Sequence, residues 1–358
     1  MNPNSSCKFL SNGLKLEIQN NQKDIEIKPC CKWYGPGVPL AVDRRKYQDF
    51  RNQIGHQQFQ TLEQCHICMQ AEKIGAKSMR QVADLMIAPD SEWGDPTHVE
   101  IQIDTTCNAA CVMCGPNLSS LWRQELGWQK NINYHSRELD PVEELCRHVD
   151  IQKIRSIAFV GGEPMLSRQD ISLLEKIEFP ELVTLAYVTN GSIYPPQQKL
   201  DLWKRFKKVR MAISIDGINS RYNYIRYPLQ WSQIQENLKL MQSDFPTMIF
   251  STIYTANILN FYYFEEFDHW FRSAGLVAPV PVYNIANGIL DPSTVPVKLY
   301  QLIVKKYGPK HFVTKTVKKF SNNNASVIEY LDQIDQRRST DWRLAFPEVA
   351  KAFESQHA

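Results

Sequence analysis

Residues 99–114 read VEIQIDTTCNAACVMC, and this stretch decides the fold prediction. Its first part, Val99 to Ile103, is a short apolar run of the kind that forms a buried strand. Its second part places Cys107, Cys111 and Cys114 in a loop directly after that strand. An iron–sulfur cubane usually has four cysteine ligands. Three cysteines at this spacing therefore predict a four-iron cluster with one iron open to an exogenous ligand.

A zinc site or three unrelated thiols are the alternatives for this loop. A structural zinc ion takes four protein ligands. The nearest further cysteine, Cys146, lies on the apolar face of a helix expected over residues 142–149, so it is poorly suited to complete a zinc site. The spacing alone is a hypothesis, and its structural context has to support it.

The remainder of the chain supplies that context. Five more apolar runs follow the first strand, at residues 157–160, 182–188, 209–215, 248–254 and 276–283. Segments with helical spacing lie between them, including residues 142–149 and 234–241. Strands that alternate with helices predict parallel βαβ units. Because such crossovers are right-handed, we expect a full or partial α/β barrel with its functional groups at the carboxyl ends of the strands.

Three of the predicted strands end in distinctive residues. The second ends in Gly161-Gly162-Glu163-Pro164, and glycines let a ligand approach the backbone closely. The third ends in Thr189-Asn190-Gly191. The fourth ends in Ser214-Ile215-Asp216-Gly217, and the segment that follows it continues to Arg226. Together with the cysteine loop, these elements resemble the radical S-adenosylmethionine (SAM) superfamily. The resemblance covers about residues 98–287 and implies a partial, six-stranded (β/α)6 TIM-like barrel.

The resemblance also implies the roles of individual residues. The open iron binds the amino and carboxylate groups of SAM, and Gly161, Gly162 and Glu163 contact the amino group. Asn190 lies beside the cofactor. The other implied cofactor-binding residues, for the ribose and carboxylate, are Ser214, Asp216 and Arg226. One position departs from the family: Met113 stands where an aromatic residue often flanks the adenine, and methionine is adaptable enough to fill that place.

Five further cysteines precede the predicted barrel. Cys65 and Cys68 form a C-x-x-C pair, and Cys7 with Cys30 or Cys31 would complete four ligands for a second cluster. Zinc remains an alternative, because such pairs also bind zinc, and so do free thiols. The arrangement resembles the auxiliary-cluster modules called SPASM and Twitch, in an N-terminal version found in bacterial and phage proteins. By that resemblance, the cysteines are followed by a basic stretch, here residues 73–80.

These patterns divide the chain into three predicted parts. Residues 1–88 form a small, irregular auxiliary cysteine module. A stretch rich in Pro, Gly and Asp, from Pro89 to Pro96, marks the boundary to the barrel, residues 96–290. Residues 291–358 form a helical extension, with helices expected over 297–304 and 327–334.

Composition excludes several classes of protein. Lys and Arg number 41 against 38 Asp and Glu, so no strong charge commits the chain to nucleic acid or an anionic membrane. No apolar run approaches the ~20 residues of a membrane span, and residues 1–21 lack the pattern of a signal peptide. We therefore expect a cytoplasmic protein, in the host cytoplasm if the gene belongs to a phage, and no membrane partner.

The resemblance implies an enzyme that cleaves SAM reductively to a 5′-deoxyadenosyl radical, which then abstracts hydrogen from a substrate. A peptide or protein side chain is the first substrate class, and a nucleotide or nucleic-acid base is the alternative. A noncatalytic iron–sulfur or zinc scaffold is a third hypothesis. The expected cofactors are a [4Fe–4S] cluster with SAM and a second cluster or zinc. An electron donor such as flavodoxin or ferredoxin is the expected partner.

Overall fold

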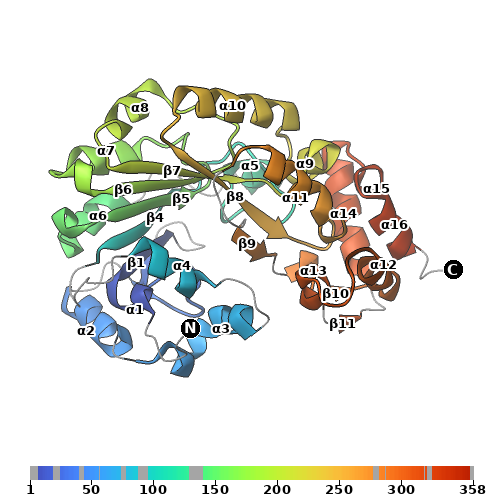
Figure 1. The fold of residues 1–358 in the computed structure, drawn as a ribbon, viewed down its shortest axis with the longest axis horizontal. Coiled ribbons are helices and arrows are strands. Elements are labelled where there is room, and N and C mark those ends of the chain that lie inside the picture. Colours follow the sequence, from blue (N-terminus) through green and yellow to red (C-terminus); the bar gives the residue numbers. More distant parts are fainter. Residues whose placement is uncertain are drawn as a thin grey trace. The chain divides into compact units, whose positions relative to one another are not determined.

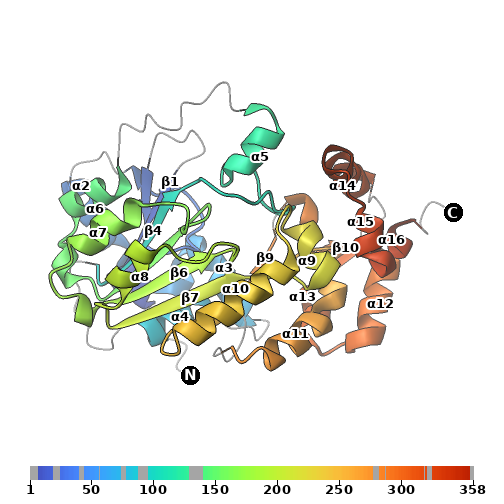
Figure 2. The same ribbon diagram turned by 90° about the horizontal axis from the view of Figure 1, so that it is seen from above.

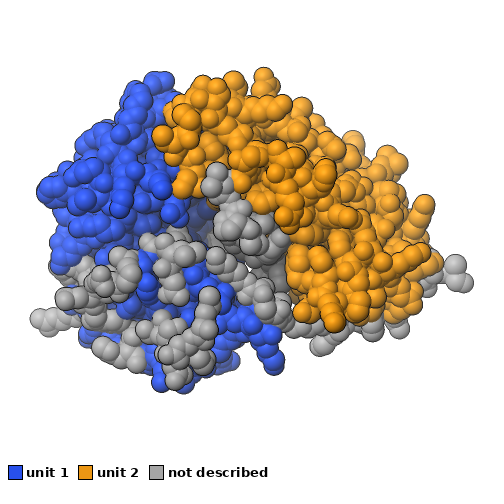
Figure 3. Space-filling model, in the orientation of Figure 1, with its two compact units in different colours: residues 1–106, 129–188, 195–210 blue, residues 107–128, 189–194, 211–358 orange. Residues whose placement is uncertain are grey.

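The computed structural model describes residues 7–18, 25–39, 44–55, 57–73, 78–87, 96–128, 140–276, 282–286, 288–317, 319–320 and 325–354. Most of the boundary expected from Pro89 to Pro96 lies outside these residues, and so do residues 277–281 of the sixth predicted strand. The chain divides into two compact units, shown in Figure 3. The first comprises residues 1–106, 129–188 and 195–210, and the second comprises residues 107–128, 189–194 and 211–358.

The first unit carries a sheet whose strands lie side by side in Figures 1 and 2. Its strands are β1 (Gly13–Ile18), β2 (Ile25–Lys28), β3 (Val38–Pro39), β4 (His98–Asp104), β5 (Ser156–Gly161) and β6 (Thr184–Thr189). Strand β4 pairs parallel with β5, and β5 with β6. Its helices are α1 (Lys8–Asn12), α2 (Arg44–Gly55), α3 (His66–Lys73), α4 (Met79–Met86), α6 (Pro141–His148), α7 (Gln169–Glu175) and α8 (Gln197–Trp203). Helices α6, α7 and α8 follow one another beside the sheet in Figure 1.

Alternation along the strands explains which face is buried. On β4, Val99, Ile101 and Ile103 are buried, while on the other face Glu100 and Asp104 are half-buried and only Gln102 between them is buried. The period of two is that of a strand with two unlike faces. Helix α6 starts where Asp140 accepts hydrogen bonds from two backbone N–H groups and Pro141 occupies the first turn.

The second unit contains the remaining elements. They are α5 (Ser120–Glu125), α9 (Asn219–Ile225), α10 (Trp231–Asp244), β8 (Ile249–Ala256), α11 (Phe264–Ser273), β9 (Val282–Ile285), β10 (Thr294–Val295), α12 (Val297–Tyr307), α13 (Phe312–Thr316), β11 (Lys319–Phe320), α14 (Ala325–Arg338), α15 (Trp342–Ala345) and α16 (Pro347–Glu354). Strand β7 (Lys208–Ser214) runs across the division between the units. Strands β8 and β9 pair parallel.

The predicted fold class is confirmed. The strand order β3-β2-β1-β4-β5-β6-β7-β8-β9 is that of an open sheet, and β4 to β9 correspond to the six strands predicted from the sequence. Of the sixth predicted strand, residues 282 and 283 lie in β9, which covers Val282–Ile285. The helices expected over residues 297–304 and 327–334 are α12 and α14.

The described part of the N-terminal segment is more regular than its composition predicts. Strands β1 and β2 form an antiparallel pair, and β1 pairs parallel with β4. The alternation of Leu14, Leu16 and Ile18 with Lys15 and Glu17 gives β1 one buried face. The N-terminal segment therefore extends the sheet of the barrel strands.

No helix among the described residues is both long and apolar enough to cross a membrane.

Candidate active site

Hydrogen bonds of its backbone groups hold the cysteine loop of residues 107–114 in place. The partners of its amide and carbonyl groups lie on other segments of the second unit. The Ala110 and Val112 amides donate to the carbonyls of Tyr227 and Ile225, at 2.7 and 2.9 Å. The Trp122 indole donates to the Cys111 carbonyl at 2.8 Å. A loop with this many fixed backbone groups holds its thiols in a defined arrangement.

The C-terminal extension supplies a further contact that the sequence did not reveal. The Tyr330 hydroxyl, on α14, donates to the carbonyl of Val112 at 2.7 Å. Arg338, near the end of the same helix, pairs with Glu125 at 3.0 Å and lies over the ring of Trp122. Arg338 and Glu125 lie 213 residues apart in the sequence, and no sequence pattern indicates that two charged residues so far apart form an ion pair. The extension thus takes part in fixing the cysteine loop.

The three loop cysteines sit in a protected environment. Cys111 is buried, and Cys107 and Cys114 are half-buried. Burial raises the pKa of the Cys111 thiol, and the Arg226 guanidinium opposes that rise. Burial likewise raises the pKa of Cys114 to about 12. The thiols must lose protons to ligate iron, so a nearby cation favours the ligating form.

Arg226 and Asp216, both predicted to bind the cofactor, pair with each other. An Arg226 Nη atom lies 2.6 Å from the Asp216 carboxylate, and both side chains are nearly inaccessible. The other Nη atom lies 3.8 Å from the sulfur of Cys111. The remaining Asp216 oxygen accepts a hydrogen bond from the Thr255 amide at 2.6 Å. The pair thus links the ends of β7 and β8 to the cysteine loop.

Asn190 is placed against the cysteine loop. Its side-chain amide donates to the side-chain oxygen of Asn108 at 2.9 Å, and its own side-chain oxygen accepts from the Ser192 backbone amide. Asn108 in turn donates to the Ser192 hydroxyl at 2.9 Å. These bonds give the buried Asn190 a role in joining the end of β6 to the cysteine loop. Ser214, at the end of β7, and Met113 are half-buried.

The Gly161–Pro164 turn lies in the first unit, tightly against the end of β4. The Gly162 amide donates to the Asp104 carbonyl at 2.9 Å, and the Glu163 amide donates to the Thr106 carbonyl at 2.8 Å. Gly161 has φ +143°, which side chains rarely permit. The Glu163 carboxylate is buried and accepts a hydrogen bond from the Met165 amide. The turn therefore adjoins Thr106, the residue that precedes Cys107.

Gly162→Ala is expected to disturb this junction. A Cβ at this position would lie 2.1 Å from the Thr106 carbonyl oxygen, so backbone has to move. Overpacking of this kind costs about 1–3 kcal/mol. We expect a lower Tm and a lower iron content after reconstitution. Gly115→Ala is the matched control, because its Cβ meets nothing within 4 Å. Equal stability and equal iron content in the two variants would contradict the expectation.

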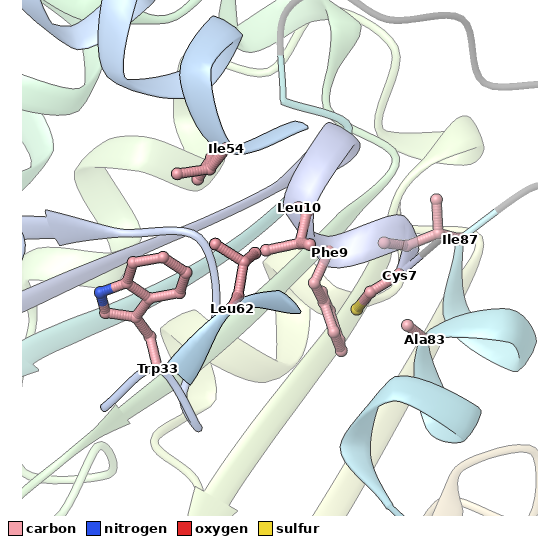
Figure 4. Close-up of a cluster of buried hydrophobic side chains, with 8 residues drawn as sticks. All are labelled: Cys7, Phe9, Leu10, Trp33, Ile54, Leu62, Ala83 and Ile87. Atoms are coloured by element: carbon pink, nitrogen blue, oxygen red, sulfur yellow. The ribbon is translucent and has the colours of Figure 1, made fainter. Parts of the chain in front are cut away.

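Four of the five N-terminal cysteines line one pocket of the first unit. We call it the N-terminal cysteine pocket and define it by its four cysteines, Cys7, Cys30, Cys65 and Cys68. Lys32, Met79 and Arg80 also border it. Figure 4 shows Cys7 among the apolar side chains beside the pocket, including Phe9, Leu10 and Ala83. Cys30 interacts electrostatically with both Cys7 and Cys68.

Cys31 is directed elsewhere. Its thiol is hydrogen-bonded to the Glu100 carboxylate, and Lys15 acts on the same group. Glu100 and Lys15 are themselves 3.5 Å apart. The sequence left the choice between Cys30 and Cys31 open, and the structure puts Cys30 at the pocket.

All-cysteine ligand sets suit an iron–sulfur cluster or zinc. As the side chains stand, the part of the chain that the structure describes holds no group of three or more His, Cys, Asp or Glu residues already arranged around a metal. The donor chemistry of both cysteine sets nevertheless fits the cluster, with three thiols in one loop and four around one pocket.

The part of the chain that contains the cysteine loop is similar to a known protein family. A family model described as the radical SAM superfamily matches residues 101–271. This match covers just under half of the chain, and it shows that residues 101–271 are similar to radical SAM enzymes. Proteins of that superfamily carry a [4Fe–4S] cluster and SAM as cofactors. The match includes Cys107, Cys111, Cys114 and every predicted cofactor-binding residue, and it leaves the N-terminal cysteines outside.

Two curated relatives of this radical SAM region are named GTP 3′,8-cyclase. The protein of Clostridium acetobutylicum is 27% identical over 124 residues, 34% of this chain and 36% of the relative. That of Alkaliphilus metalliredigens is 26% identical over 144 residues, 40% of this chain and 42% of the relative. The chain thus spans less than half the length of these relatives.

Solved structures are also similar to the chain. One is Streptococcus suis SuiB bound to its precursor peptide SuiA, 12% identical, with 88% of this chain and 58% of that chain covered and a TM-score of 0.41. Another is anSMEcpe with bound AdoMet, 17% identical, with 58% of each chain covered and a TM-score of 0.41.

Proposed function

We propose that this chain cleaves SAM reductively and uses the resulting radical to abstract hydrogen from a substrate. The observation that carries the proposal is the backbone-pinned loop with Cys107, Cys111 and Cys114, beside the buried Arg226–Asp216 pair. When bound, the cluster and SAM supply an electron and a carbon–sulfur bond whose cleavage gives a 5′-deoxyadenosyl radical and methionine. The chain's own residues bind, orient and protect these groups.

Arg226 has two tasks in this proposal. Its charge lies beside Cys111, where it favours the thiolate that ligates iron. Asp216 holds the Arg226 guanidinium in place, so that Arg226 would be positioned to pair with the carboxylate of SAM once cluster and cofactor are bound. Arginine presents paired donors to a carboxylate, which suits this position. Gly161, Gly162 and Glu163 contact the amino group of SAM, Met113 flanks its adenine, and Asn190, Ser214 and Asp216 line the remainder.

The N-terminal cysteine pocket is proposed to bind a second [4Fe–4S] cluster. Its support is the convergence of Cys7, Cys30, Cys65 and Cys68 on one pocket of the first unit. Lys32 and Arg80 border the same pocket, and positive charge there offsets the negative charge of four thiolates. Zinc is the competing occupant, since four thiolates also suit that ion.

A peptide or protein side chain is the proposed substrate, because the four-cysteine pocket resembles the auxiliary modules of peptide-modifying enzymes. A nucleotide is the second candidate, and the two relatives named GTP 3′,8-cyclase favour it. The electron donor is proposed to be a small flavodoxin or ferredoxin, acting in the cytoplasm.

The decisive experiment is anaerobic turnover. The reconstituted protein, reduced with dithionite and given SAM, is expected to release 5′-deoxyadenosine and methionine in equal amounts, measured by liquid chromatography. No 5′-deoxyadenosine from a protein with a full cluster would reject the enzyme and leave the metal-binding scaffold.

The two substrate classes are separated in the same assay. GTP and synthetic peptides encoded next to the gene are added in parallel, and the rate of 5′-deoxyadenosine formation is compared. Stimulation by a peptide alone, with a mass change in that peptide, supports the first class. Stimulation and consumption of GTP alone supports the second and rejects the first.

A further inference from the structure

Lys199 is a lysine buried where lysines are rarely found. Its side chain is inaccessible to solvent, as are those of Asp170 and Tyr187 beside it. Lysine is almost never fully buried unless it is paired. The ammonium lies 2.9 Å from the Asp170 carboxylate, which supplies the counter-charge. We call Lys199, Asp170, Tyr187 and Trp203 the Lys199 network.

The network connects three elements of the first unit. Lys199 and Trp203 lie on α8, Asp170 on α7 and Tyr187 on β6. The Tyr187 hydroxyl donates to Asp170 at 2.8 Å and accepts from the Trp203 indole at 3.0 Å. Burial raises the pKa of Asp170, against the opposing effect of Lys199. Desolvated charges are costly, and a stable helix layer could be built without them.

The remaining contact of Lys199 indicates what the network does. Its ammonium donates to the carbonyl of Pro164 at 2.7 Å. Pro164 ends the Gly161–Pro164 turn, whose other side is held by the Asp104 and Thr106 carbonyls. The turn is thus held by β4 on one side and by a charged donor on the other. A charge-assisted hydrogen bond of this kind is stronger than a neutral one.

We propose that Lys199 is a positioning residue for SAM: by holding the Pro164 carbonyl, it fixes the Gly161–Glu163 backbone that contacts the cofactor's amino group. The inference rests on the proposed function, because it requires SAM at this turn. Asp170 neutralises and orients Lys199, while Tyr187 donates to Asp170 and Trp203 donates to Tyr187. Lys199 does not touch the cofactor.

The test variant is Asp170→Asn with Lys199→Met, which removes both charges together and leaves no unpaired buried ion. Tyr187→Phe is the matched control within the network, since it removes a buried hydrogen bond and keeps Lys199 on Pro164. Lys204→Met is the surface control, because the exposed Lys204 follows α8 and pairs with the exposed Asp201.

Three quantities are measured on the reconstituted full chain: Tm, iron content, and SAM affinity from the change that SAM causes in the electron paramagnetic resonance spectrum of the reduced cluster. We expect the double variant to keep its iron and to bind SAM about ten-fold more weakly, the loss of one charged hydrogen bond. Tyr187→Phe should lower the Tm and leave SAM affinity unchanged, and Lys204→Met should change neither.

A second readout needs no cofactor. Hydrogen exchange of the peptide that spans residues 161–168 is expected to speed up in the double variant and to stay unchanged in Tyr187→Phe. Wild-type affinity in the double variant, equal weakening in Tyr187→Phe, or loss of fold or iron in the double variant would each overturn the inference. If the wild-type protein, loaded with cluster, binds no SAM, the proposed function fails and the inference fails with it.

Discussion

Changing Cys107, Cys111 and Cys114 together to Ala is expected to abolish SAM cleavage and to remove about four irons per protein, the content of one cubane. The three thiols are the only ligands that the loop offers, and their backbone is fixed by contacts to α5, α9 and α14. The measurements are iron and sulfide analysis and 5′-deoxyadenosine formation under dithionite.

Cys146→Ala is the matched control for this triple change. Cys146 lies half-buried on α6 and belongs to neither cysteine set. It should keep full iron content and full activity. The assignment is wrong if the triple variant still cleaves SAM, or if Cys146→Ala loses as much iron as the triple variant does.

The second large effect concerns the N-terminal cysteine pocket. In the triple-variant background, about four irons should remain if the pocket holds a cluster. Adding Cys30→Ala is expected to remove them, because Cys30 lines the pocket with Cys7, Cys65 and Cys68. Adding Cys31→Ala should leave them, because that thiol bonds Glu100. Elemental analysis of the two variants side by side makes the measurement.

Other outcomes of this experiment are equally informative. One zinc ion per protein that is lost on Cys30→Ala would show that the same four cysteines bind zinc and not a cluster. No metal at all in the triple variant would reject both occupants. Iron that depends on Cys31 and is indifferent to Cys30 would show that the chain path after β2 presents the other thiol to the pocket.

Metal loading of the pocket should also depend on pH. Burial raises the pKa of Cys7 to about 11 and that of Cys65 to about 12. Both groups are therefore protonated near neutral pH, and ligation has to displace their protons. Since fewer protons are displaced at higher pH, the apparent affinity for metal rises with pH. This sign holds for a cluster and for zinc alike.

The sequence by itself determined the features that depend on residues close together in the chain. The strand at Val99 to Ile103 and its five successors were predictable, because a buried strand is a short apolar run whatever lies around it. The spacing of Cys107, Cys111 and Cys114 indicated a three-thiol cluster loop for the same reason, since all three ligands lie within eight residues. Both features depend on neighbours along the chain, and a sequence displays those directly.

Only the tertiary structure decided how distant residues meet. It paired Arg226 with Asp216 and placed that pair at Cys111, selected Cys30 over Cys31 at the pocket, and put β1 beside β4. It also brought Lys199 to the carbonyl of Pro164, 35 residues earlier in the chain. Each of these contacts depends on the side to which a strand or helix presents a residue after a turn. On a strand, a shift of one residue moves a side chain to the opposite face, and the composition does not record which register the fold adopts.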